Sequence, residues 1–364
     1  MLSPNALKVL DALSVYSRVR VKGYNFETLE YKDGEGKLTE VYEFGGEEKY
    51  GYKALRIYRA VLIDELMEML KEKGVKILFG MKFVKVLEET EQGVSWEFAD
   101  GTVGKASLLV GADGIHSTVR KYLYPDLKPT FAGGMGVTAA VPTEQLKLPH
   151  GYHIPVTITT PHGCFVIAPQ QVDGSEVLIG KQKRIDVDPG RAGWDAISAD
   201  KEALVKFLQQ DTEYFPEFVK NAASNIGHGK INIWPYYIVP KFERWTSDKR
   251  RVIILGDSAH AIPPSAGQGI NQAFEDVYIF ALLLGQAGKV ELQDALKFWQ
   301  EYREQRIAKV MDLNRQIELR RMTEEERAKM PPGSMHEIEL SWLYKPNFKD
   351  DVNNWVATRS GLKA

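Results

Sequence analysis

A buried strand that runs straight into a glycine-bearing helix start constrains this chain of 364 residues more than any other feature. The segment covers residues 252–276 and reads VIILGDSAHAIPPSAGQGINQAFED. Its first four residues are apolar and end at Gly256, which is typical of a strand covered on both faces in a parallel sheet. Asp257 follows at the carboxyl end of the strand, the edge where α/β sheets bind ligands, and its carboxylate can accept hydrogen bonds from sugar or ribityl hydroxyls. The segment therefore predicts a dinucleotide site.

The loop after this strand is suited to a flat ring. Pro263 and Pro264 form a stiff turn without amide donors, and two glycines remove side chains where a helix begins at about Ile270. Exposed amides and the positive end of that helix would stabilise the negative charge that a reduced flavin carries. We expect cofactor contacts from Pro264, Gly267, Gln268, Gly269, Ile270 and Asn271. The alternative is an ordinary strand, loop and helix of an α/β domain.

Three motifs carry a resemblance to a known family. GDSAHAIPPSAGQG, residues 256–269, resembles the second flavin-binding motif of the single-component, FAD-dependent aromatic hydroxylases, which include p-hydroxybenzoate and salicylate hydroxylases. LLVGADGIHSTVR, residues 108–120, resembles the family's Asp-Gly motif and implies that Asp113 lies near the flavin and the approach of the nicotinamide nucleotide. RAVLIDEL, residues 59–66, implies that Arg59 meets the FAD pyrophosphate, where a guanidinium forks onto phosphate oxygens. Any amphipathic helix could carry the arginine pattern alone, so the order and spacing of all three motifs carry the resemblance.

The start of the chain departs from the family pattern. Relatives open with a strand, a Gly-x-Gly-x-x-Gly turn, a helix and a second strand ending in an acidic residue, and residues 1–13 resemble the segment that follows this unit. We expect a cofactor domain without its first βαβ unit, in which the adenine half of FAD is poorly held. An internal start codon, a deliberately shortened chain and a natural loss of FAD are the three explanations. Gly134 and Gly136 match the glycine pattern, but no strand precedes them, so we interpret the match as false.

The fold class that we predict is α/β. An FAD/NAD(P)-binding Rossmann-like domain, incomplete at its N-terminus, is expected over residues 1–128 and 241–330. A β-rich α+β substrate domain is expected as an insertion over 129–240, because strand-like runs such as VTITT, CFVIAP and EVLIG dominate there. C-terminal helices complete the cofactor domain, and residues 331–364 form a tail with loop-like signals.

Apolar periodicity and turn residues predict the individual elements. Helices are expected over 5–20, with Ser3 as N-cap and Pro4 at the first position, and over 59–73, 201–209 and 291–321. Strands are expected over 24–31, 39–44, 75–79, 83–89, 94–98 and 108–110, with Asp100 and Gly101 as a hairpin turn. Ser117 is expected to cap a helix that Arg120 continues.

Composition narrows the class of protein. The formal net charge of -2 shows no bias toward nucleic acid, and no apolar run approaches the roughly 20 residues that span a bilayer, so we expect no stable membrane insertion. Cys164 is the single cysteine, so an internal disulfide is excluded, which fits a cytoplasmic location. Cys164 lies in the apolar run GCFVIAP, so we expect it to be a small core residue. His150 and His153 form an isolated pair, so no metal site is expected. No Gly-x-Ser-x-Gly elbow of a serine hydrolase occurs.

The resemblance implies a monooxygenase that uses FAD, NADPH or NADH, and O2 to insert one oxygen atom into a small aromatic or other electron-rich molecule. A base that removes a phenolic proton would raise the ring's nucleophilicity, and His162 and Tyr237 are candidates, although either could instead be satisfied within the core. The alternative is a flavin-free descendant that binds a small hydrophobic ligand, for example a non-redox isomerase or cyclase. Monomer and homodimer, NADH and NADPH, and the identity of the substrate stay open.

Overall fold

The computed structural model describes residues 1–360. These residues form two compact units, each assembled from three stretches of chain. We call the first the sheet unit; it contains Met1–Met69, Phe131–Tyr236 and Leu313–Tyr344. The second contains Leu70–Thr130, Tyr237–Asp312 and the described residues from Lys345 onward, and we call it the motif unit because both aspartate motifs lie in it.

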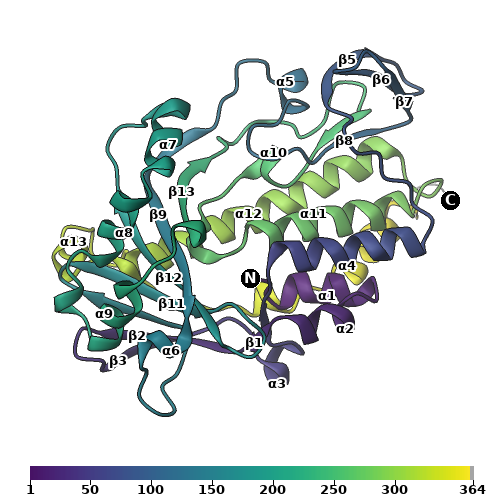
Figure 1. Cartoon of the computed structure of the whole chain (residues 1–364). Coiled ribbons are helices and arrows are strands. Elements are labelled where there is room, and N and C mark those ends of the chain that lie inside the picture. The colour runs from purple at the N-terminus through teal and green to yellow at the C-terminus, as the bar shows by residue number, and fades with distance from the viewer. Residues whose placement is uncertain (361–364) are drawn as a thin grey trace. The chain divides into compact units, whose positions relative to one another are not determined.

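A seven-stranded sheet, visible in Figure 1, organises the sheet unit. Its strand order is β13-β9-β12-β11-β10-β2-β3, and the β10–β2 pair is parallel. The central strands β10 and β11 are buried along almost their whole length, so both faces of the sheet are covered there. Their bounds are β2 Thr28–Asp33, β3 Leu38–Glu43, β9 Thr130–Pro142, β10 Val156–Thr160, β11 Gly163–Pro169, β12 Glu176–Arg184 and β13 Ile231–Ile238.

Short helices cover one face of this sheet. Ile158, Phe165 and Ile179 are fully buried on that face, and Phe165 contacts the ring of Phe215 at 6.1 Å. Cys164 is buried and free, as predicted. The helices of this region are α6 Thr143–Leu146, α7 Gly190–Ala199, α8 Lys201–Gln209, η2 Thr212–Tyr214, α9 Glu217–Ser224 and η3 His228–Lys230, and α8 has the predicted bounds.

The glycine pair on β9 has a packing role. Both glycines lie inside the strand, which confirms that the glycine pattern there does not form a dinucleotide-binding turn. A Cβ on Gly136 would lie 3.0 Å from the Tyr236 hydroxyl, and one on Gly134 would lie 3.3 Å from the same ring. The ring of Tyr236 therefore occupies space that only glycine leaves on this strand.

The N-terminal part of the sheet unit corrects one predicted helix. Ser14 has a φ of +61°, which no α-helix accommodates, so the helix expected over 5–20 is divided there. Pro4 takes the first position of α1 as predicted, and Ser3 is the N-cap, although its hydroxyl donates to the Asn5 side chain at 2.6 Å. The remaining bounds are α1 Pro4–Ala12, α2 Tyr16–Val19, η1 Arg20–Lys22, β1 Tyr24–Phe26, α3 Glu47–Tyr50, β4 Ala54–Arg56, α4 Arg59–Glu72, α13 Glu324–Ala328 and α14 Ser341–Tyr344.

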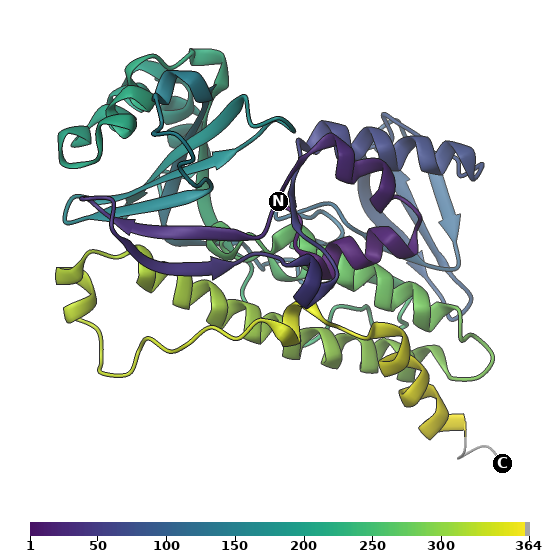
Figure 2. The ribbon, with the colours of Figure 1, turned by 90° about the horizontal axis from the view of Figure 1, so that it is seen from below.

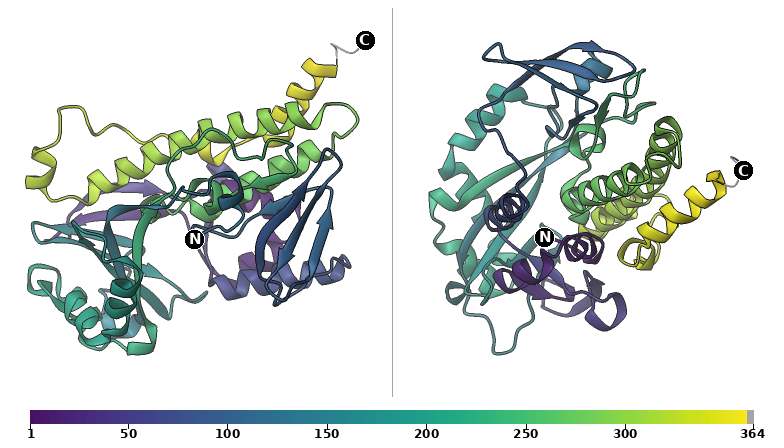
Figure 3. Two further views of the ribbon diagram at one scale, coloured as in Figure 1. Left: turned by 90° about the horizontal axis from the view of Figure 1, so that it is seen from above. Right: turned by 90° about the vertical axis from the view of Figure 1, so that its right-hand side faces the viewer.

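The motif unit contains a parallel pair, β14-β8, and a three-stranded meander, β5-β6-β7. Figure 3 shows the meander as blue strands. The predicted turn at Asp100 and Gly101 lies between β6 and β7. Helices α11 and α12 supply most of the remaining core, and a tryptophan of α12, Trp299, is completely buried. The bounds are β5 Phe83–Glu89, β6 Val94–Phe98, β7 Val103–Ala106, β8 Leu109–Gly111, α5 Arg120–Leu123, β14 Val252–Ile254, α10 Asp257–His260, η4 Pro264–Ala266, α11 Gly269–Leu284, α12 Leu292–Arg321 and α15 Phe348–Ser360.

The strand predicted over 75–79 is wrong. No strand pairs with this segment among the described residues, so its amides have no ladder to join. Its apolar side chains are consequently exposed, with Phe79 at 76%. The apolar run that suggested a buried strand has no covering layer in the described part of the chain.

The loop-like prediction for the region beyond Met330 is also wrong, because α14 and α15 form there. Figure 2 shows α15 near the C-terminal end, and it packs against α11. Two aromatic side chains of α15 hold it in place. The ring of Trp355 stacks on that of Phe298, with 4.6 Å between the ring centres, and the ring of Phe348 packs against that of Tyr278, with 6.2 Å between the ring centres. None of the helices in the part of the chain that the structure describes is both apolar enough and long enough to cross a membrane.

Candidate functional site

The two aspartate motifs lie at one edge of the parallel strand pair. β8 pairs with β14 in parallel, with Gly111 opposite Ile254. Because the carboxyl ends of parallel strands meet at the same edge of a sheet, the loops of Asp113 and Asp257 leave the pair side by side. This is the edge at which the sequence predicts a ligand.

Asp113 organises its own loop. Its carboxylate accepts hydrogen bonds from the hydroxyls of Ser117 and Ser258, and from the amides of Thr118 and Val119 at 2.6 and 3.1 Å. Burial opposes ionisation, but these hydrogen bonds outweigh it and hold the pKa of Asp113 below its ordinary value. The carboxylate is therefore ionised at neutral pH, and its direct effect is to shape the backbone of the loop.

Arg120 ties the two loops together, a role that the sequence did not indicate. Its side chain is 2% exposed and donates to the carbonyls of Ser258 at 2.9 Å and Ile115 at 2.6 Å. The Gly114 amide adds a hydrogen bond to the Ser258 hydroxyl at 3.0 Å. The Ser117 hydroxyl accepts from the Arg120 amide at 2.8 Å, but the N-cap of α5 is Val119, so the prediction that Ser117 caps this helix is wrong.

Asp257 is exposed beside the start of helix α11. Gly256 has a φ of +57°, a conformation that glycine adopts without strain, and it turns the chain out of β14. A Cβ on Gly269 would lie 4.0 Å from the Asp257 Oδ1 atom, so the carboxylate faces the first turn of α11. Asp257 makes no hydrogen bond or ion pair with any residue that the structure describes. Its carboxylate is therefore open to a ligand.

The start of α11 offers backbone donors next to this carboxylate. Gly267 takes the left-handed conformation, with φ +64°, directly before the helix. The first amides of a helix have no acceptor within it, and those of Gly269 and Ile270 donate to no other acceptor in the described chain. An open carboxylate, free amides and a positive helix end fit the ribityl chain and ring of a flavin.

The other predicted contact residues line the same turn. Pro264 and Ile270 are exposed, whereas Gln268 and Asn271 are buried. The Asn271 amide group donates to the Gly267 carbonyl at 2.7 Å and so supports the turn from inside. The structure thus brings all six predicted residues of this segment into one continuous turn, and their contacts with a cofactor stay a prediction.

Arg59 belongs to the sheet unit and begins α4. Its guanidinium lies 5.5 Å from the ring of Trp234 and forms no hydrogen bond or ion pair with a described residue. An exposed guanidinium held against a ring at a helix start can donate hydrogen bonds to a phosphate, which is the role that the family resemblance implies.

The two candidate bases lie on different elements of the chain. His162 is exposed in the turn between β10 and β11, where its ring stacks on Tyr214 at 3.7 Å. Tyr237 is half-buried on β13. For its neighbour Tyr236, burial raises the pKa to about 12, so that phenol is neutral at physiological pH. The catalytic roles of His162 and Tyr237 stay predictions.

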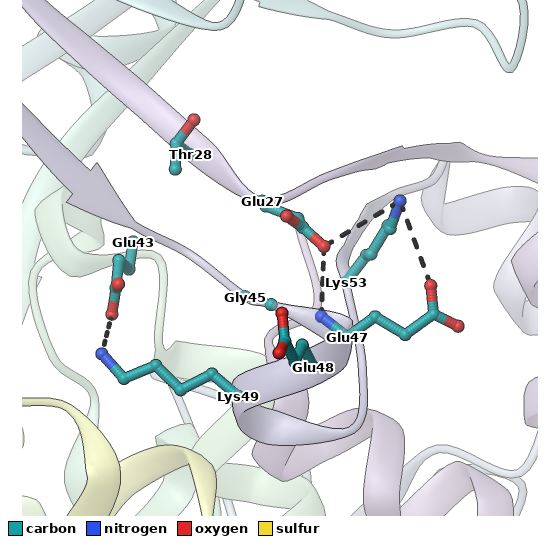
Figure 4. A pocket seen from close by; sticks show the side chains of 9 residues that line it. Glu27, Thr28, Glu43, Gly45, Glu47, Glu48, Lys49 and Lys53 are labelled. Carbon is teal, nitrogen blue, oxygen red and sulfur yellow. Dashed lines mark hydrogen bonds and ion pairs between the residues drawn. The ribbon is translucent and has the colours of Figure 1, made fainter.

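A second concavity lies in the sheet unit. Figure 4 shows this pocket of about 540 Å3, where dashed lines join Glu43 to Lys49 and Glu27 to Lys53. Both of its lysines thus pair with glutamates of the same pocket. Among residues 1–360, no group of three or more histidine, cysteine, aspartate or glutamate side chains is placed to hold a metal ion.

Comparison with known proteins identifies the family. A family described as "FAD binding domain" matches residues 1–314. The chain belongs to this family. It is 29% identical over 314 residues to 3-amino-4-hydroxybenzoate 2-monooxygenase PtnB3 of Streptomyces platensis, covering 85% of this chain and 75% of that protein. It is 26% identical to hispidin-3-hydroxylase of Neonothopanus nambi, covering 77% of this chain and 69% of that protein. The predicted resemblance to FAD-dependent aromatic monooxygenases is confirmed.

Solved structures confirm the α/β fold class. CtdE in complex with FAD and a substrate superposes with a TM-score of 0.79 at 21% identity, covering 99% of this chain and 89% of that one. A salicylate hydroxylase substrate complex superposes with a TM-score of 0.78 at 21% identity, covering 98% and 90%. The large sheet and the helical C-terminal region are shared features of this fold.

Proposed function

We propose that this protein is a monooxygenase that inserts one oxygen atom of O2 into a small aromatic molecule with FAD as cofactor and NAD(P)H as reductant. The observation that carries the proposal is the open carboxylate of Asp257 facing the free amides at the start of α11. The family assignment and the activities of relatives named for the hydroxylation of phenolic rings support it.

Each residue of the site has a role in this proposal. Asp257 accepts a hydrogen bond from a ribityl hydroxyl and fixes the cofactor's orientation. The amides of Gly269 and Ile270, with the positive end of α11, stabilise negative charge on the ring. Arg59 neutralises the pyrophosphate. When bound by these residues, FAD would supply the redox chemistry that links NAD(P)H to O2.

The protein's remaining task is to place the aromatic ring and to exclude water. Residues 264–271 form the turn at the start of α11, which we call the flavin turn. Pro263 is buried just before it and Pro264 is exposed at its beginning, so this stiff segment can form one wall against a substrate. A phenolic substrate gains nucleophilicity when a base removes its proton, and His162 and Tyr237 are the candidates for that step. Tyr236, held neutral, is suited to donate or accept a hydrogen bond.

The test has two stages. Purified protein is mixed with FAD and dialysed, and the absorbance near 450 nm gives the amount of flavin retained. The flavin-bound protein is then supplied with NADH or NADPH, a panel of hydroxybenzoates and 18O2, and products are analysed by mass spectrometry. One 18O atom per hydroxylated product supports the proposal. A protein that retains no flavin, yet binds an aromatic ligand, would instead support a flavin-free binding function.

A further inference from the structure

Next to the flavin turn, the motif unit contains a largely buried ionic cluster that the proposed chemistry does not use. Its members are Gln272, Glu275 and Asp276 on α11, Arg303 and Arg306 on α12, and His260 on α10. Glu275, Asp276 and Arg303 have no exposed side-chain surface. Such burial of charge is expensive unless every group is paired, so the arrangement needs a reason.

The pairing within the cluster is complete on its charged atoms. Arg303 donates from Nε to Asp276 at 2.7 Å, from one terminal nitrogen to Glu275, and from the other to the Gln272 side chain at 2.6 Å. Arg306 donates two hydrogen bonds to Glu275, at 2.6 and 2.9 Å. Two guanidinium groups thus balance two carboxylates. Burial opposes the charge on Asp276, but His260 and Arg303 hold the pKa of Asp276 below its ordinary value.

Asp276 connects this cluster to the flavin turn. Besides Arg303, its carboxylate accepts from the Gly256 amide at 2.8 Å and bonds to the His260 ring at 2.6 Å. Gly256 directly precedes Asp257, and His260 ends the short helix that Asp257 begins. A Cβ on Gly256 would lie 3.3 Å from Ala273, so the turn already touches α11 closely. One carboxylate therefore holds both ends of the segment that carries Asp257 against the helix that carries the free amides.

Buried ion pairs add little net stability compared with apolar side chains of the same size, because desolvation offsets their attraction. They do fix geometry, since a buried carboxylate with three donors has one favourable position. We propose that Asp276, held by Arg303, is a positioning residue that sets the distance between the Asp257 carboxylate and the amides at the start of α11. This inference rests on the proposed function, because the distance matters only to a ligand that contacts both.

Three variants test the proposal with FAD and riboflavin as probes: Asp276→Asn, Arg303→Gln and the double variant. Either single change leaves an uncompensated buried charge, so both the stability of the flavin-free protein and the flavin affinity should fall. The double variant restores charge balance, and we expect most of the stability to return. Its affinity for both flavins should stay about tenfold below that of the unaltered protein. The comparison is with metal sites, where replacing a residue that supports a ligand typically lowers the affinity by about 10- to 100-fold. The visible spectrum of the bound flavin should also differ.

A matched control lies in the sheet unit. Glu40 accepts from Arg320 at 2.7 and 2.9 Å, so Glu40→Gln removes a more exposed carboxylate from an arginine outside the motif unit. It should change stability without altering the flavin affinity or spectrum. The inference would be overturned if the double variant regained normal flavin affinity and a normal spectrum together with its stability. Asp276 would then be a purely structural residue. Should Asp276→Asn not accumulate as folded protein, the double variant carries the same test.

The result for the unaltered protein separates the two proposals. If it binds neither FAD nor riboflavin, the proposed function fails and this inference falls with it. If it binds flavin and the double variant binds equally well, only the positioning role is refuted.

Discussion

Replacing Asp257 with alanine tests the flavin turn more directly than any other single change. The carboxylate is exposed, faces Gly269 and has no partner among the described residues, so its contribution should appear only when a ligand binds. Loss of one hydrogen bond to a charged acceptor removes about 1.5–3 kcal/mol of binding free energy. That corresponds to a dissociation constant about 10- to 150-fold higher.

The assay is an equilibrium titration that follows the quenching of flavin fluorescence. FAD and riboflavin are both used, because the ribityl chain is common to them, and both should lose affinity by the same factor. Folding should be nearly unaffected, since substitutions at exposed positions usually change the free energy of unfolding by less than about 0.5 kcal/mol. Asp126→Ala is the matched control, because Asp126 is an exposed loop aspartate of the same unit.

Two outcomes would refute the reasoning. Unchanged affinity in Asp257→Ala would mean that the carboxylate does not meet the ribityl chain. An equal loss in Asp126→Ala would mean that the effect comes from net charge and not from a contact. An affinity loss for FAD alone would move the contact of Asp257 from the ribityl chain to the pyrophosphate or the adenosine.

Three further predictions concern other parts of the chain. Arg59→Ala should weaken FAD binding by about 1.5–3 kcal/mol and leave riboflavin binding unchanged, because only FAD carries the pyrophosphate; the same titration checks this, and an equal loss for both flavins would contradict it. Gly136→Ala should lower the free energy of urea unfolding by about 1–3 kcal/mol, since its Cβ would lie 3.0 Å from the Tyr236 hydroxyl; Gly227→Ala, where nothing lies within 4 Å, is the control and should have little effect. Asp113 has a lowered pKa in the folded protein, so its stabilising effect is present above the unfolded pKa of about 3.9 and is lost as pH falls through the folded pKa. The free energy of unfolding, measured between pH 5 and pH 2.5, should therefore depend less on pH in Asp113→Asn. Identical slopes of this free energy against pH in the two proteins would count against the prediction.

Local signals predicted the elements that carry the flavin turn. The apolar run before Gly256, the glycines at 267 and 269, and the apolar face of the long helix each depend on residues close in sequence, and the observed β14, α11 and α12 follow them closely. The hairpin at Asp100 and Gly101 has the same origin, because turn chemistry is local.

The wrong predictions concern elements whose structure is not determined by neighbouring residues alone. The segment 75–79 has the composition of a strand, but a strand needs a partner, which no local pattern reveals. Helix α15 depends on contacts such as Trp355 on Phe298, a residue far away in sequence. The left-handed conformation of Ser14 interrupts a sequence whose apolar spacing continues as a helix.

The buried ionic cluster was missed although one signal pointed to it. Arg303 lies four residues after Trp299 and seven before Val310, so it falls on the apolar face of α12. A charged residue on a buried face needs a buried partner. The adjacent acidic pair at Glu275 and Asp276, directly before the apolar half of α11, could have been proposed as that partner. Which carboxylate meets which guanidinium depends on the packing of the two helices and could not be derived from the sequence.

A crystal structure of the protein with FAD is the most direct test of the central claim. We predict that the isoalloxazine ring lies against the amides from Gly267 to Asn271 and that a ribityl hydroxyl donates to the Asp257 carboxylate. A flavin bound elsewhere, or a structure in which protein atoms cover the amides of Gly269 and Ile270, would contradict the account.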